Sequence, residues 1–177
     1  DQVEVIPEHA GACRLRDDIR AAALARLHSE HAHDELTLHT HIFGYFLRRM
    51  RESISDQQRA IAEEICLNHL GELFRLIAAR REWQTLAAHV AAIRAAQPQH
   101  PRHLHQIMFY AAYVAVRTQD YAHGEAVLTE LLDQDEMRDD LRVQVLNALG
   151  QIDWFQTRYD RALHFYEQVQ SLAHVTG

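Results

Sequence analysis

Lysine is absent from this chain of 177 residues, so all 18 lysine or arginine positions are arginines, against 25 acidic residues. The net charge of −7 offers no basic surface of the kind that binds a phosphate backbone. Nucleic acid is therefore not expected as a partner of this segment. Only six glycines and three prolines interrupt a chain rich in helix-favouring residues, which predicts an all-α fold.

Motifs that carry chemistry are also scarce. The chain has no Gly-rich phosphate loop and no Gly-Lys pair, so we expect no nucleotide site, no catalytic residue and no enzymatic activity in this segment itself. Cys13 and Cys66 are isolated and lack metal or redox spacing, which predicts reduced thiols and a cytoplasmic location. No apolar run approaches the length of a membrane span, so no membrane partner is expected.

The 14 histidines raise the question of a metal site. His39 and His41 lie two residues apart on a predicted helix, about 200° around it, so they cannot bind one ion together. His28 and His31 could share a face, but no cysteine or carboxylate completes a ligand set there. We therefore expect solvated or capping histidines, with no metal and no cofactor in this segment. A metal-dependent enzyme that uses the histidine clusters is a remote alternative.

The start of the chain differs from the rest. Between residues 2 and 16, short alternating stretches flank the turn residues Pro7 to Gly11, which predicts a β-hairpin. A helix is expected to begin at Asp17, which can cap it. A hairpin followed by one helix is too small for a domain, so we interpret residues 1–32 as the end of one.

The remaining chain shows the periodicity of amphipathic helices. Two long helices are expected first, from about Asp34 to Arg51 and from Ser55-Asp56 to about Arg80. Shorter helices are expected at 83–96, 102–117, 121–133, 139–156 and 159–175. We assign residues 33–66 to arm or linker helices and 67–177 to a repeat array.

The array is predicted from a constant spacing of aromatic and apolar residues. Trp83, Tyr121 and Tyr159 each open the second helix of a pair, and the two intervals between them are equal. The same period superposes further apolar residues: Leu70, Met108 and Leu146; Leu76, Val114 and Ile152; Val90, Leu128 and Tyr166; Ile93, Leu131 and Val169. Such recurrence is typical of stacked helix pairs, here 67–101, 102–137 and 138–177.

The last copy resembles the tetratricopeptide repeat. Leu149-Gly150 in one helix, then Tyr159, Ala162 and Tyr166 in the next, match the pattern of that family. The resemblance implies an antiparallel helix-pair solenoid, with Gly150 and Ala162 at a close helix crossing and the two tyrosines between neighbouring pairs.

The first copy, residues 67–101, is degenerate. Phe74 and Leu86 stand where small residues are expected, so its helices are expected to cross differently.

The segment Arg14-Leu15-Arg16-Asp17-Asp18-Ile19-Arg20 resembles the end of the winged-helix domain of STAND signalling ATPases, which include the NB-ARC proteins. By this resemblance, Arg16 takes the place of a histidine that approaches the nucleotide phosphates, and Asp17 that of the aspartate after it. The helices through Leu38 and Arg49 are similar to the arm helices of that family. The resemblance implies ATP or ADP in the parent protein. The hairpin of an unrelated domain is the alternative.

In stacked helix pairs the first helices line the inner surface, and those of their residues not needed for packing are candidates for partner binding. The candidates are Gln106, Phe109, Tyr113, Arg117, Asn147, Gln151, Trp154 and Phe155. Aromatic, amide and arginine side chains are typical of protein-binding surfaces. Alternatively, Phe109, Trp154 and Phe155 pack against the following repeat.

These patterns predict a module for protein–protein interaction and regulatory sensing. We expect it to bind an inducer, or another protein or peptide, as well as neighbouring repeats of its own chain, and to control a STAND-type nucleotide switch. A plain tetratricopeptide adaptor is the alternative. A phosphate-binding loop well before residue 1 would distinguish the first reading from the second.

The last predicted helix is more apolar than one neighbouring helix can cover. Its apolar residues are Leu163, Tyr166, Val169, Leu172 and Val175. We expect the natural chain to continue into further repeats and the 177-residue chain to self-associate. Its mass in solution should rise with concentration, and Leu172→Glu should keep it monomeric, because burial stabilises by roughly 25 cal/mol per Å² of apolar surface. A monomer at all concentrations would contradict this.

Overall fold

The computed structural model describes residues 3–5, 13–15, 32–52, 55–134 and 137–176. Strands β1 (Val3–Val5) and β2 (Cys13–Leu15) pair antiparallel, with Val3 opposite Leu15 and Val5 opposite Cys13. The helix predicted from Asp17, together with Arg16, lies outside the described residues.

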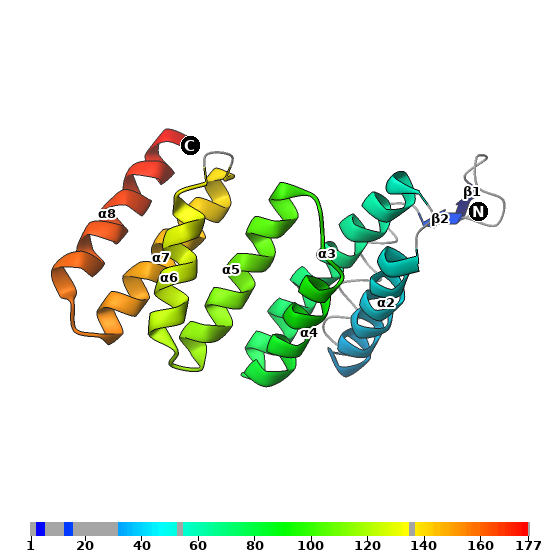
Figure 1. Cartoon of the computed structure of the whole chain (residues 1–177), viewed down its shortest axis with the longest axis horizontal. Helices are drawn as coiled ribbons and strands as arrows, with labels where there is room; N and C mark the ends of the chain where they lie inside the picture. Colours follow the sequence, from blue (N-terminus) through cyan, green and yellow to red (C-terminus); the bar gives the residue numbers. More distant parts are fainter. Residues whose placement is uncertain (1–2, 6–12, 16–31, 53–54, 135–136, 177) are drawn as a thin grey trace.

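From Ala32 onward the described chain is helical with short connections (Figure 1). The helices are α2 (Ala32–Glu52), α3 (Asp56–Ala79), α4 (Trp83–Ala95), α5 (Pro101–Arg117), α6 (Tyr121–Leu132), α7 (Asp139–Phe155) and α8 (Tyr159–Thr176). All helix ends lie within two residues of those predicted, and the all-α class is confirmed. Of the described helices, none is both long and apolar enough to cross a membrane.

Each of these helices packs against the next one in the chain. In addition, α5 contacts both α3 and α7, so the first helices of successive pairs touch one another. Figure 1 shows the result, with the helices side by side in chain order from α2 at one end to α8 at the other. One continuous core extends through this row and includes Phe43, Ile77, Leu128 and Ile152.

Three of the connections share one backbone geometry. Arg81, Gln119 and Thr157 follow α3, α5 and α7, and their φ angles of 59°, 67° and 61° are left-handed. In each turn the next N–H donates to the carbonyl five residues earlier: Glu82 to Ile77 at 3.2 Å, Asp120 to Ala115 at 2.8 Å and Arg158 to Asp153 at 2.8 Å. This is the Schellman motif of helix ends. The period of the sequence is therefore also a period of the backbone.

Small residues line the helix crossing of the second copy. At the crossing of α5 and α6, Ala112 and Gly124 are both buried, and a Cβ on Gly124 would lie 2.9 Å from Val116 Cγ2 and 3.4 Å from the Ala112 carbonyl oxygen. Phe74 and Leu86 occupy the equivalent positions of α3 and α4. The contact between α3 and α4 is less extensive than that between α5 and α6, which is in line with the different crossing expected for this copy.

The crossing of α7 and α8 contains a correction. A Cβ on Gly150 would lie 2.7 Å from Tyr166 Cε1, so the Tyr166 ring covers this glycine. Tyr166 thus packs within its own helix pair, whereas the sequence placed it between pairs. The ring grows from the third turn of α8 and lies back over α7 because Gly150 has no side chain to exclude it.

Of the aromatic residues that open the second helices, Trp83 and Tyr121 pack between pairs, whereas Tyr159 packs within its own pair and not between pairs as the sequence placed it. The Trp83 ring, at the start of α4, meets Tyr113 of α5 edge-on with a centroid distance of 6.2 Å. Tyr121, at the start of α6, stacks on Phe155 of α7 at 6.0 Å. Tyr159 opens α8, where it meets Trp154 at 5.1 Å and remains 54% exposed.

Two glycine substitutions test the close crossing of α5 and α6. Gly124→Ala should lower the free energy of unfolding by on the order of 1 to 3 kcal/mol, because the new methyl group overlaps the stiff Val116 side chain. Gly44→Ala is the matched control, since it is exposed on α2 with nothing within 4 Å of a new Cβ. It should stabilise by roughly 0.5–1 kcal/mol. Urea unfolding measures both, and equal stabilisation by both would contradict the crossing.

Candidate protein-binding surface

A groove crosses α3, α5 and the beginning of α7. Its volume is about 340 Å³, within the range of small-ligand pockets. The polar side chains along it include Asn68, Arg102, His103, Gln106, Tyr110 and Arg138. The side-chain amides of Asn68 and Gln106 each offer hydrogen-bond donors and an acceptor, which is what the backbone of an extended peptide requires.

Gly71 makes room for one wall of this groove. A Cβ at Gly71 would lie 3.3 Å from the Tyr110 hydroxyl oxygen, so the absence of a side chain lets the Tyr110 ring lie against α3. The ring also stacks on Phe74 with a centroid distance of 4.4 Å. Burial raises the pKa of Tyr110 to about 12, with Glu72 adding to the rise and the hydrogen bond with Gln106 opposing it. The Tyr110 hydroxyl is therefore neutral and remains a hydrogen-bonding group.

A buried carboxylate stabilises the structure at one end of the groove. Glu63 of α3 is 2% exposed, and its oxygens accept hydrogen bonds of 3.0 Å from the backbone N–H groups of Gln99 and His100, just before α5. The His103 ring lies between two carboxylates, with Nδ1 2.7 Å from Glu63 and Nε2 2.9 Å from Glu64. Both nitrogens can donate only in the imidazolium form. These bonds tie the N-terminus of α5 to α3.

The same bonds set the ionisation of Glu63. Burial by itself would raise the pKa of this carboxyl group, but the hydrogen bonds from Gln99, His103 and His100, with the charge of His103, outweigh it and lower the pKa below 4.5. Arg59, one turn earlier on α3, donates to the carbonyls of Ala96 at 3.0 Å and Gln97 at 2.8 Å. The connection between α4 and α5 is thus held by two charged side chains of α3.

The predicted partner-binding residues differ in accessibility. Phe109 is 4% exposed and packs in the core, Gln106, Tyr113, Arg117, Asn147 and Gln151 are half-buried, and Trp154 and Phe155 are 57% and 52% exposed. Of these residues, Gln106 lines the groove. The burial of Phe109 leaves little of its side chain accessible to a partner. Arg16 and Asp17 lie outside the described residues.

Tyr113 and Arg117 belong to a second surface feature, near the turn after α3. Arg117 donates a hydrogen bond of 2.7 Å to the Tyr113 hydroxyl group. Its guanidinium carbon lies 4.8 Å from the centre of the Tyr113 ring and 5.9 Å from that of Trp83. Cation–π contacts of this kind fix the arginine head group. With Ala78 and Arg81, these residues border a hollow of about 440 Å³.

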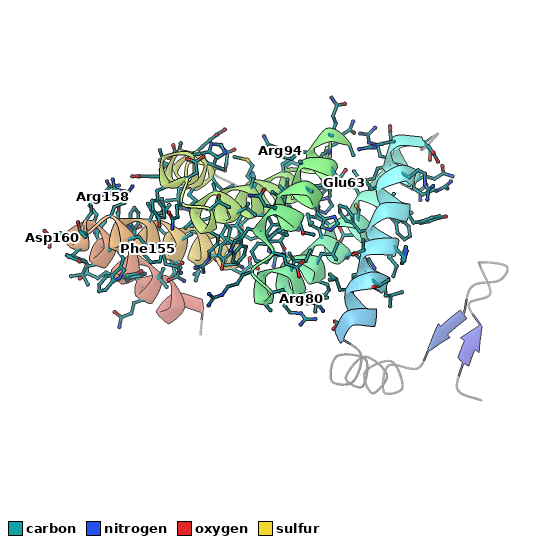
Figure 2. All side chains as sticks on the ribbon, turned by 90° about the horizontal axis from the view of Figure 1, so that it is seen from below. Glu63, Arg80, Arg94, Phe155, Arg158 and Asp160 are labelled. Atoms are coloured by element: carbon teal, nitrogen blue, oxygen red, sulfur yellow. The ribbon has the colours of Figure 1, made fainter. Side chains whose placement is uncertain are left out.

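Phe155 lies with Arg158 and Asp160 at the end of the row that carries α7 and α8, while Glu63 lies in the other half of the molecule (Figure 2). A cluster of ion pairs lies in this part of the molecule. Asp153 of α7 is 1% exposed and pairs with Arg158 and with Arg161, the latter at 3.3 Å. Glu125 of α6 pairs with the same two arginines at 2.8 and 2.9 Å. The cluster joins three helices.

Most of the groove and this cluster were not predicted from the sequence, although the repeat held signals for both. Asn68 and Gln106 stand at equivalent positions of α3 and α5, and Gln144 stands at that of α7. Asp153 stands where the earlier copies have Ile77 and Ala115, so it is a lone charge on an apolar face.

Cys66 is a buried free thiol of α3. Burial, with a contribution from the negative charge of Glu63, raises its pKa to about 12. The thiol is therefore protonated at neutral pH and is a poor nucleophile and metal ligand. Its role is in packing between α2 and α3, with Sγ 3.8 Å from the Phe43 carbonyl oxygen.

Comparisons of this chain with family models, with curated proteins and with solved structures gave no match.

The lowered pKa of Glu63 predicts a pH dependence of stability. Because its pKa is lower in the folded state, ionised Glu63 stabilises the fold above its unfolded-state pKa, and this contribution is lost as pH falls through the folded-state value. Glu63→Gln should cost on the order of 1.5–3 kcal/mol at neutral pH, and the difference from wild type should shrink below about pH 4. Urea unfolding across this range measures it. Glu64→Gln, whose side chain is 61% exposed, is the control with little expected effect at either pH.

Proposed function

We propose that this chain is a protein-interaction module built from tetratricopeptide-type helix pairs, and that it binds an extended peptide segment of a partner along the groove of α3, α5 and α7. Two features support the assignment to tetratricopeptide-type repeats. The turn within each helix pair has the same geometry, and Gly124 and Gly150 lie at the helix crossings of the last two pairs. The contacts of α5 with both α3 and α7 support a continuous inner surface.

One observation carries the peptide-binding proposal: amide side chains recur at equivalent positions of the three first helices. Asn68, Gln106 and Gln144 occupy the same position of successive copies, on α3, α5 and α7. Contacting helices are about 8–10 Å apart, and an extended chain rises about 3.3 Å per residue, so each amide would meet about every third peptide residue. Hydrogen bonds to the peptide backbone would give affinity with little demand on the peptide's sequence.

Aromatic and arginine side chains elsewhere on the first helices would add selectivity. Trp154 and Phe155 are more than half exposed at the end of α7. Tyr113 and Arg117, with their fixed geometry, form the corresponding feature on α5. Rigid aromatic and arginine side chains are the residues that most often dominate binding energy at protein interfaces.

The regulatory part of the proposal is a sensor for a STAND-type nucleotide switch. It is supported by the resemblance of residues 14–20 and of the arm helices to that family. In this proposal the parent protein binds ATP or ADP, with Arg16 and Asp17 close to the nucleotide, and partner binding shifts the parent between two states. A plain adaptor without an ATPase domain is the competing proposal.

Selection from a random peptide display library, followed by affinity measurement on the selected peptides, tests the groove. The triple variant Asn68→Ala, Gln106→Ala and Gln144→Ala should weaken binding by at least about tenfold, since each lost hydrogen bond contributes around 1 kcal/mol. The matched control replaces three exposed amides of α4, α8 and the α6 end, Gln84, Gln170 and Gln134, by Ala. Equal loss in both triple variants, or no selected peptide, would contradict the proposed groove.

The full reading frame of the parent decides between sensor and adaptor. If a phosphate-binding loop lies upstream, nucleotide exchange by the full-length protein should respond to a groove-binding peptide, and the Asn68, Gln106 and Gln144 triple variant should abolish that response. Peptide binding by a parent protein that has no upstream nucleotide-binding domain would support the adaptor proposal instead.

A further inference from the structure

Metal-ligating side chains meet on the side of α3 that faces α2. Glu35 and His39 lie one turn apart on α2 and are only 1% and 8% exposed. His69 and Glu72 lie one turn apart on α3. One donor atom each from Glu35, His39 and Glu72 can be chosen so that all three lie within 4.8 Å of one another. Metal–ligand bonds of about 2.0–2.2 Å place two tetrahedral ligands about 3.3–3.6 Å apart, so side-chain movements of about 1 Å would bring these donor atoms to ligand separation.

We propose that Glu35, His39 and Glu72 bind one divalent ion of the zinc class, which links α2 to α3. A set of two carboxylates and one imidazole suits zinc, which accepts nitrogen and oxygen ligands, better than magnesium or calcium, which prefer oxygen alone. Three protein ligands leave a coordination position for water. The burial of Glu35 and His39 means that two of the ligands are already held in place by the helix packing.

His69 supports the ligand geometry of His39. The two Nδ1 atoms are 2.7 Å apart, so one ring donates a hydrogen bond and the other accepts it. When His39 donates, its Nε2 carries a lone pair, and this atom lies 3.9 Å from Glu35 Oε1. In the proposed site this lone pair would bind the ion beside the Glu35 carboxylate. A second hydrogen-bonding partner that orients the ligating histidine is a general feature of metal sites.

Arg75 competes with the ion for the same two carboxylates. One terminal nitrogen of its guanidinium group lies 2.7 Å from Glu35 Oε1, and its Nε lies 2.9 Å from Glu72 Oε2. This charge offsets the cost of burying the Glu35 carboxylate. The Arg75 side chain is 53% exposed, so it can move into solvent when an ion takes over its role. Metal and Arg75 are therefore alternative partners of one carboxylate pair.

The sequence pointed away from a metal because it considered His39 together with His41. His41 is exposed on α2. The metal-binding types of side chain that meet His39 are instead Glu35, one turn earlier, and His69 and Glu72 of α3, which lie 30 or more positions away. Folding brings them together through the packing of α2 along α3.

Titration calorimetry with zinc chloride at near-neutral pH tests the proposal on the chelator-treated chain. The wild-type chain should bind one zinc ion with these ligands. Glu72→Gln or His39→Gln should weaken this binding at least about tenfold, and His69→Phe by about 10–100-fold. Arg75→Gln should tighten it about tenfold, because the competing cation is removed. His41→Gln, on the same helix, is the control and should bind as wild type does.

Circular dichroism and thermal unfolding check that each variant folds, and zinc should raise the unfolding temperature of wild type but not of His39→Gln. Absence of zinc binding by the wild-type chain overturns the proposal, whatever Arg75→Gln does. Binding that survives His39→Gln and Glu72→Gln but is lost in His103→Gln also overturns it, because the ion would then belong to the histidine cluster before α5.

Discussion

The backbone turn between the two helices of a pair is the constraint on which the rest of the array depends. Arg81, Gln119 and Thr157 adopt left-handed conformations that cost non-glycine residues on the order of 1 kcal/mol each, yet the same turn occurs three times. Each turn fixes the direction of the second helix and so decides which face of the first helix it covers. The turn after α5 brings α5 and α6 close together at Ala112 and Gly124, which are both small residues. The face of α5 that α6 does not cover carries Gln106.

The first copy shows what happens when the crossing is not tight. Phe74 and Leu86 keep α3 and α4 apart, and α3 finds its closest partner in α2 instead. Glu63 then holds the α4–α5 connection through charged hydrogen bonds in place of close helix contact. The boundary expected between arm and array, at residues 66 and 67, falls inside α3. If the array binds a partner as proposed, α3 is the helix through which a tilt of the array would be carried into the arm.

Helix positions and the repeat could be predicted from the sequence because both depend on local periodicity and on recurrence. The orientation of individual side chains could not. Tyr166 lies over Gly150, in the preceding helix, and His39 meets His69, 30 positions later, so both contacts depend on the distance and angle at which two helices cross. Phe109 was predicted at the surface because its spacing fits the inner face, but it is buried in the core, where its ring contacts those of Tyr110 and Tyr113 in its own helix.

The polar clusters do not recur from copy to copy, so they make each helix interface chemically different from the others. The apolar residues, which do recur, cannot do this. Similar apolar faces in every copy would allow a helix to pair one repeat out of register. Asp153 forms an ion pair with Arg158, whereas the residues at the equivalent position of the other copies, Ala115 and Ile77, are uncharged and cannot do so. A misplaced α8 would leave the buried Asp153 carboxylate without its arginine partners, at a cost of several kcal/mol. Glu63 likewise has its hydrogen-bond donors at one interface only, where it accepts from the backbone N–H groups of the residues before α5. Because replacing a buried ion pair by apolar residues is often neutral for stability, the advantage of these pairs lies in selecting one register.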